Sequence, residues 1–99
     1  MKNTPTKPTK ARISRVWIER KRQRDEVGVI AKASIVSNAG VRQTLCSGGC
    51  WYYYLADARR AIDNDNGELI NLRSELASFG FGTRAIDYAM KNVERKEMP

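Results

Sequence analysis

Two cysteines that frame Ser-Gly-Gly come nearest to a reactive or metal-binding pattern in this chain. Cys46 and Cys50 could supply two of the four ligands that structural zinc requires, but no other cysteine and no histidine is present to complete the set. Carboxylates or a second copy of the chain could complete such a site, and a disulfide could close the loop if the glycines made a tight reversal. We expect ordinary reduced thiols on buried or half-buried side chains instead, with no metal and no cofactor.

The lack of histidine also bears on catalysis. Histidine is the commonest general acid or base and the usual partner of a serine or cysteine nucleophile. The backbone N–H groups of residues 47–49 could hold an anion, but the segment lacks the lysine and the spacing of a P-loop and indicates a turn. The sequence therefore predicts a protein that is not an enzyme.

Basic residues are concentrated at the N-terminal end of the chain. Residues 1–24 contain nine Lys and Arg against one acid, whereas residues 25–99 contain nine against ten. This segregation predicts a surface for a polyanion, which could be nucleic acid, an acidic protein face or an anionic membrane. The alternative is a solvated tail and a charged hairpin that discourages edge pairing. The candidate polyanion-binding residues are Lys7, Lys10, Arg12, Arg15, Arg20, Lys21, Arg22 and Arg24.

The densest aromatic cluster is the run Trp51-Tyr52-Tyr53-Tyr54. On a strand, some of these rings would point outward and offer platforms for base stacking or anchors for a protein partner. Trp51, Tyr52 and Tyr54 are therefore candidate interface residues. The alternative is a seam between sheet and helices with the hydroxyl groups at its rim. Residue propensities favour a strand over a helix for this run.

Hydrophobic periodicity predicts the elements that position these residues. Residues 1–10 contain two prolines and three lysines and predict a disordered basic arm, followed by one α+β domain over residues 11–99. The first strand begins near Ala11, with Val16 and Ile18 on one face and Ile13 and Trp17 on the other. A charged hairpin tip over residues 20–26 leads to a second strand over residues 27–36.

The second strand is expected to place Val29, Ala31 and Ala33 on one face and Ile30 on the other. A turn over residues 37–40 and a third strand over residues 41–46 follow. The predicted sheet is thus an antiparallel meander of three strands, or of four if residues 51–54 join it.

Two or three helices are predicted after the meander. Helical spacing begins at Leu55, and the run of Asp and Asn over residues 63–67 predicts a break before a second helix with Leu72 and Leu76 inward. Gly80 is expected to cap that helix. Thr83 is expected to cap a last helix that runs through Val93 into a charged tail over residues 94–97.

This layout resembles small accessory proteins of bacteriophages and mobile elements, including anti-CRISPR and other anti-defence inhibitors. The features that carry the resemblance lie within residues 11–95. They are the short meander, Ser47-Gly48-Gly49 followed by Trp51, and a terminal helix pair with Leu72, Leu76, Phe79-Gly80-Phe81 and Ile86. Many such inhibitors are acidic mimics of nucleic acid, whereas this chain is basic, so the resemblance implies an inhibitor that blocks an acidic protein surface or works together with nucleic acid.

The sequence as a whole predicts a binding protein that acts on a nucleic-acid-handling system. Its basic N-terminal region and basic hairpin would contact nucleic acid or an acidic surface of the protein machinery. The alternative is an inhibitor that docks on a host defence complex without contacting nucleic acid. No apolar run approaches the roughly 20 residues of a membrane span, so we expect a cytoplasmic protein with no membrane partner.

Overall fold

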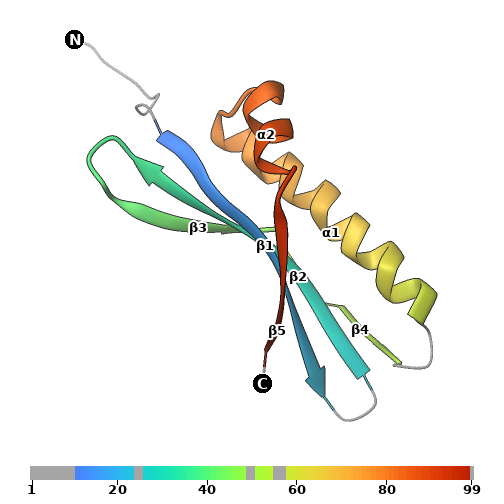
Figure 1. The fold of residues 1–99 in the computed structure, drawn as a ribbon. Coiled ribbons are helices and arrows are strands. Elements are labelled where there is room, and N and C mark those ends of the chain that lie inside the picture. Colours follow the sequence, from blue (N-terminus) through green and yellow to red (C-terminus); the bar gives the residue numbers. More distant parts are fainter. Residues whose placement is uncertain (1–10, 24–25, 49–50, 55–57, 99) are drawn as a thin grey trace.

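The computed structural model describes residues 11–23, 26–48, 51–54 and 58–98, which form one mixed sheet and two helices (Figure 1). The elements in chain order are β1 (Ala11–Gln23), β2 (Glu26–Ser37), β3 (Arg42–Cys46), β4 (Trp51–Tyr54), α1 (Ala58–Phe79), α2 (Thr83–Ala89) and β5 (Val93–Met98). The predicted α+β class is confirmed. The predicted arm over residues 1–10, with Lys7 and Lys10, lies outside the described residues, as do Arg24 and Cys50.

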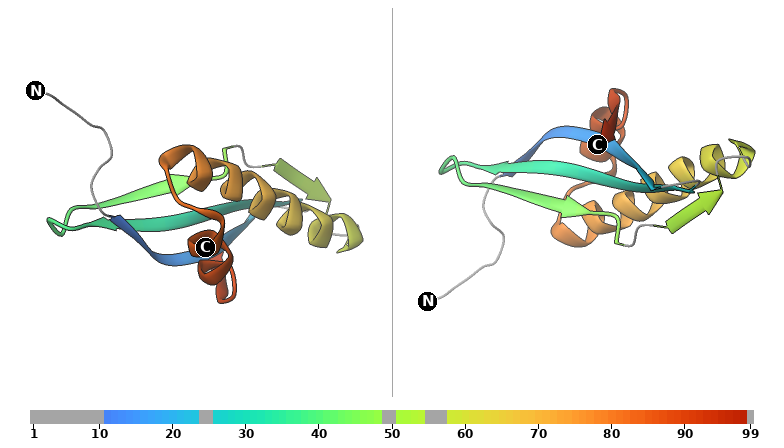
Figure 2. Two further views of the ribbon diagram at one scale, coloured as in Figure 1. Left: turned by 90° about the horizontal axis from the view of Figure 1, so that it is seen from above. Right: turned by 90° about the horizontal axis from the view of Figure 1, so that it is seen from below.

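The sheet has the strand order β3-β2-β1-β5, and β4 also pairs with β2. β3 pairs with residues 32–36 of β2 and β4 with residues 26–29, so these two short strands follow one another along the same edge (Figure 2). The fourth strand that the aromatic run allowed is therefore present. The predicted antiparallel meander of β1, β2 and β3 is confirmed, and β5 adds a parallel strand beside β1 that the sequence did not predict.

The β1–β2 hairpin is longer than the sequence predicted. Residues 20–23 belong to β1 and Glu26 opens β2, with Arg20 opposite Val29 and Lys21 opposite Gly28. The predicted charged tip over residues 20–26 is wrong for these residues, and residues 24–25 lie outside the described part. A strand tolerates this basic run because each second side chain can point away from the core.

A bulge changes the alternation of β1 near its start. The register shifts between Ile13 and Arg15, which leaves Ser14 as an extra residue in the ladder. Ile13 therefore packs against the core, as Val16 and Ile18 do, while Trp17 lies on the opposite face. The prediction that Ile13 shares a face with Trp17 is wrong for this reason.

The core lies between one face of the sheet and the two helices. α1 packs on β2 and β3, and α2 packs on β1. The buried hydrophobic residues of this layer are Val16, Ile18, Val29, Ala31, Ala33, Ile35, Leu72, Leu76 and Ile86. The predicted inward residues of β2 and of the helices are thus confirmed where the structure describes them.

α1 is one helix of 22 residues that continues through residues 63–67, so the predicted break is wrong. The polar side chain of Asp65 is buried there, and it finds partners on the sheet that the local sequence does not reveal. Gly80 does end the helix, with φ of 126°. Its N–H and that of Phe81 both donate to the Leu76 carbonyl, which confirms the predicted cap.

The C-terminal segment differs most from the prediction. Gly82 is the N-cap of α2, so Thr83 is the first helical residue rather than the cap, and the helix ends at Ala89. Residues 93–98 form β5, not the end of a helix and a charged tail. Residues 93–98 form a strand because the second edge of β1 is free to pair with them through backbone hydrogen bonds. The periodicity of the sequence does not reveal this pairing.

Candidate nucleic-acid interface

The sheet face opposite the helices is the strongest candidate for a binding surface. No helix or strand in the described part of the chain covers it, and we call it the open face. Strand alternation and the pairing register place six basic and two acidic described side chains there. They are Arg12, Arg15, Lys21, Lys32, Arg42 and Lys96, with Glu19 and Glu94.

Trp17 lies near the centre of the open face and is only 9% exposed. The Arg15 guanidinium lies 4.9 Å from the centroid of its ring and the Lys96 ammonium 5.2 Å. These distances are within the range of cation–π attraction. Trp17 therefore acts as a platform that orders two cations, and its own ring is largely covered.

Glu19 organises the cation beside Trp17. Its carboxylate accepts a hydrogen bond of 2.8 Å from Trp17 Nε1 and lies 2.9 Å from Lys32 Nζ. Burial raises the pKa of Glu19, but the hydrogen bonds from Trp17 and Lys32, together with the charges of Lys32 and Lys96, outweigh it and hold the pKa below its ordinary value of 4.5. The group is therefore ionised at neutral pH and fixes Lys32 in place.

The other ion pair of the open face is exposed to solvent. Arg15 and Glu94 form an ion pair at 3.4 Å, but their side chains are 49% and 59% exposed, so the pair contributes little to stability. Among the described side chains, Arg12, Lys21 and Arg42 have no ion-pair partner. The face therefore keeps an excess of positive charge.

On the helix-covered face, two arginines form ion pairs with a buried carboxylate. Arg20 forms an ion pair with Asp65, whose side chain is 3% exposed, and Arg95 Nε lies 3.5 Å from the same carboxylate oxygen. Arg20 and Lys21, which sequence reasoning grouped in one basic cluster, thus point to opposite faces. Arg22 pairs through its backbone with Val27, and its side chain lies outside the described part.

A second buried polar group joins the sheet to α1. The Ser47 N–H donates to the Ala31 carbonyl at 2.9 Å, and the Ala31 N–H donates back to Ser47 Oγ at 3.1 Å. Ser47 Oγ donates to Glu68, so Ser47 joins the sheet to α1 where β3 ends, and its N–H is already used within the protein. Sequence reasoning missed Asp65 and Glu68, although both lie on the same side of α1 as Leu72.

The predicted thiol and aromatic sites are only partly described. Cys46 is an exposed free thiol on β3, so the expectation of burial is wrong for it, and no group of three or more possible metal ligands occurs among the described residues. The backbone of β4 places Tyr52 opposite Gly28, Tyr54 opposite Glu26 and Trp51 opposite Val29. Their side chains lie outside the described part, so their use in stacking stays a prediction.

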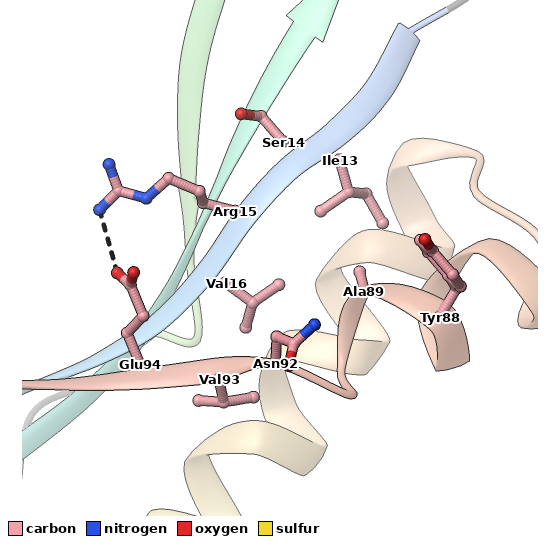
Figure 3. Close-up of a pocket in the computed structure, with 9 residues that line it drawn as sticks. All are labelled: Ile13, Ser14, Arg15, Val16, Tyr88, Ala89, Asn92, Val93 and Glu94. Carbon is pink, nitrogen blue, oxygen red and sulfur yellow. Dashed lines mark hydrogen bonds and ion pairs between the residues drawn. The ribbon is translucent and has the colours of Figure 1, made fainter.

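A pocket lies where the bulge of β1 passes the end of α2 (Figure 3). Ile13, Ala89 and Tyr88 lie at its helix end, and the Arg15–Glu94 pair lies on the other side of β1 and β5. Its polar lining includes Ser14 and Asn92 besides the Arg15–Glu94 pair.

Comparison with protein-family models, curated proteins and solved structures finds no match for this chain. The resemblance to anti-defence proteins accordingly stays a prediction. In the described residues no helix has both the length and the apolar character needed to cross a membrane. The geometry of the open face is therefore the basis for assigning a function.

Proposed function

We propose that this protein binds nucleic acid through the open face, chiefly by contacts to phosphates. The observation that carries the proposal is the set of six basic side chains on one uncovered sheet face against two carboxylates. One of these carboxylates, Glu19, is largely buried and already paired with Lys32. Phosphate contacts of this kind release counterions and supply most of the affinity of non-specific nucleic-acid binding.

The same face is less suited to docking a protein. Protein interfaces gain most of their affinity from exposed aromatic and apolar anchors that enter pockets on the partner. In the described part of the open face the one aromatic ring is that of Trp17, and its own cations cover it. The cations are also spread over four strands. This arrangement fits an extended polyanion better than it fits a single acidic pocket on a protein.

A pair of charge-matched variants tests this proposal. Arg12→Gln with Lys21→Gln removes two cations from the open face, whereas Arg84→Gln with Lys91→Gln removes two exposed cations from the region of α2. Binding to labelled DNA is measured by fluorescence anisotropy over a salt series. We expect the open-face variant to lower the slope of log affinity against log salt by about two, and the control variant to leave it nearly unchanged.

Two results would overturn the proposal. One is an equal loss of affinity in both double variants, because binding would then follow net charge rather than the open face. The other is negligible binding of the unmodified chain to any nucleic acid at low salt. That result would favour an acidic protein surface as the partner.

A further inference from the structure

We infer, on the basis of the proposed function, that the open face takes duplex DNA, held by its two phosphate backbones, and not a single strand held by stacked bases. The inference depends on three properties of the face. These are the absence of an accessible ring among its described side chains, the two-dimensional spread of its cations and the fixed positions of three of them.

The first property concerns stacking. Proteins that bind single strands without sequence preference place successive bases on exposed aromatic side chains. Here Trp17 is 9% exposed, and Arg15 and Lys96 lie over its ring. A base could reach the ring only by displacing two cations that the phosphates need. The centre of the face is therefore built to present positive charge, not an aromatic surface.

The second property is the shape of the cation array. Arg12 and Lys21 lie nine residues apart on β1, which corresponds to about 30 Å along the strand. Across the strands, Arg42 on β3 and Lys96 on β5 are three strand spacings apart, about 14 Å. Along the strands they are offset by about 23 Å, because Arg42 lies level with Arg12 and Lys96 lies level with Glu19. A single backbone would follow one line and use part of this array. A duplex presents two backbones on either side of a major groove about 12 Å wide, which is close to the breadth of the array across the strands.

The third property is order. Arg15 and Lys96 are held against Trp17, and Lys32 is held by Glu19, so three of the six cations are positioned before any ligand arrives. Preorganisation favours a partner whose own charges have fixed spacing, because neither side then loses much conformational freedom on binding. Duplex DNA has this property and a flexible single strand does not.

The test compares a mixed-sequence DNA duplex with each of its separated strands, using the full chain. At about 0.1 M salt we expect the duplex to bind about tenfold more tightly, the effect of one or two additional phosphate contacts, and to show the steeper salt dependence. Changing the duplex sequence should alter Kd less than about threefold, because phosphate contacts carry no direct sequence information.

Tyr54→Leu tests whether stacking on β4 contributes to binding. Because the inference assigns binding to phosphate contacts and not to stacked bases, it requires this variant to preserve the ratio of duplex to single-strand affinity. A single strand that binds as tightly as the duplex would overturn the inference and leave the proposed function intact, provided that binding still falls with Arg12→Gln and Lys21→Gln. A loss of most duplex affinity in Tyr54→Leu would also overturn it. Failure of both DNA forms to bind at low salt would overturn the proposed function itself.

Discussion

The two faces of β1 use the same residue type for opposite purposes. Arg20 points toward α1 and forms an ion pair with the buried Asp65, whereas Arg15 points to the open face and lies over Trp17 beside an exposed carboxylate. A strand sorts neighbouring basic residues by parity, so a run of cations is divided between internal structure and the surface. A run of basic residues in a sequence therefore need not form a single basic patch on the surface of the folded protein.

The energetic consequences of the two faces also differ. Removing one partner of a buried ion pair leaves an uncompensated charge inside the protein, which is strongly destabilising. Removing one partner of an exposed pair changes stability little, because solvent screens both charges. Changes on the helix-covered face should consequently affect unfolding, and changes on the open face should affect binding.

Asp65→Asn is the strongest test of this difference between the two faces of the sheet. The variant leaves Arg20 and Arg95 without their carboxylate, and we expect it to lower the free energy of unfolding by about 3 kcal/mol. Urea denaturation measures the effect. Asp87→Asn is the matched control, since Asp87 forms an exposed pair with Arg73 and its loss should cost less than about 1 kcal/mol. Equal effects of the two variants would contradict the contrast.

Ser47→Ala tests the second polar contact of the helix-covered face. It removes the acceptor of the Ala31 N–H and the donor to Glu68, so we expect about 2 kcal/mol of destabilisation. Ser34→Ala, on the open face of β2, is the control and should change stability by less than about 0.5 kcal/mol. Thermal melting followed by circular dichroism compares the two, and a larger shift for Ser34→Ala would refute the assignment.

Trp17→Leu tests how the order of the cations on the open face affects DNA binding. The variant removes the ring that positions Arg15 and Lys96 but keeps every cation of the open face. We expect DNA affinity to fall about threefold, the size of a partly exposed cation–π contribution, with an unchanged salt slope. Anisotropy at a temperature where circular dichroism shows the variant folded provides the measurement. A loss as large as that of the Arg12→Gln and Lys21→Gln pair would mean that DNA contacts the ring itself.

The smallest expected effect concerns pH and Glu19. Because the pKa of Glu19 is lower in the folded protein than its ordinary value of 4.5, the ionised group stabilises the fold above pH 4.5. That contribution is lost as the pH falls through the lowered pKa. Glu19→Gln should therefore be less stable than the unmodified chain at neutral pH, and the difference should shrink in acid. A stability difference that grew on acidification would contradict this assignment.

The sequence allowed much of the inner layer to be predicted, because burial leaves a periodic signal. The alternation of Val29, Ala31 and Ala33 and the glycine cap at Gly80 follow from local residue types. The bulge at Ser14 has no such signal, yet it reverses the face of Ile13. The polar run around Asp65 led to the prediction of a helix break. The prediction failed because the partners of Asp65, Arg20 and Arg95, come from strands far away in the chain and leave no local signal.

The candidate interface was predictable only in part for the same reason. Arg12, Arg15 and Lys21 belong to the predicted basic segment and lie together on the open face. Lys32, Arg42 and Lys96 reach that face from three other strands, and no local pattern marks them. β5 was missed because its alternation of polar residues becomes informative only beside the free edge of β1.

The position of β5 has a consequence for how this protein is made. Arg15 and Glu94, which meet across β1 and β5, are separated by 79 residues. During synthesis β1 can pair with β2 early, but its other edge stays bare until residues 93–98 leave the ribosome. Pairings between such distant segments form slowly, and an unpaired strand edge invites association with other chains. Late pairing of β5 with β1 is therefore the step at which this chain is expected to be most exposed to association with other chains.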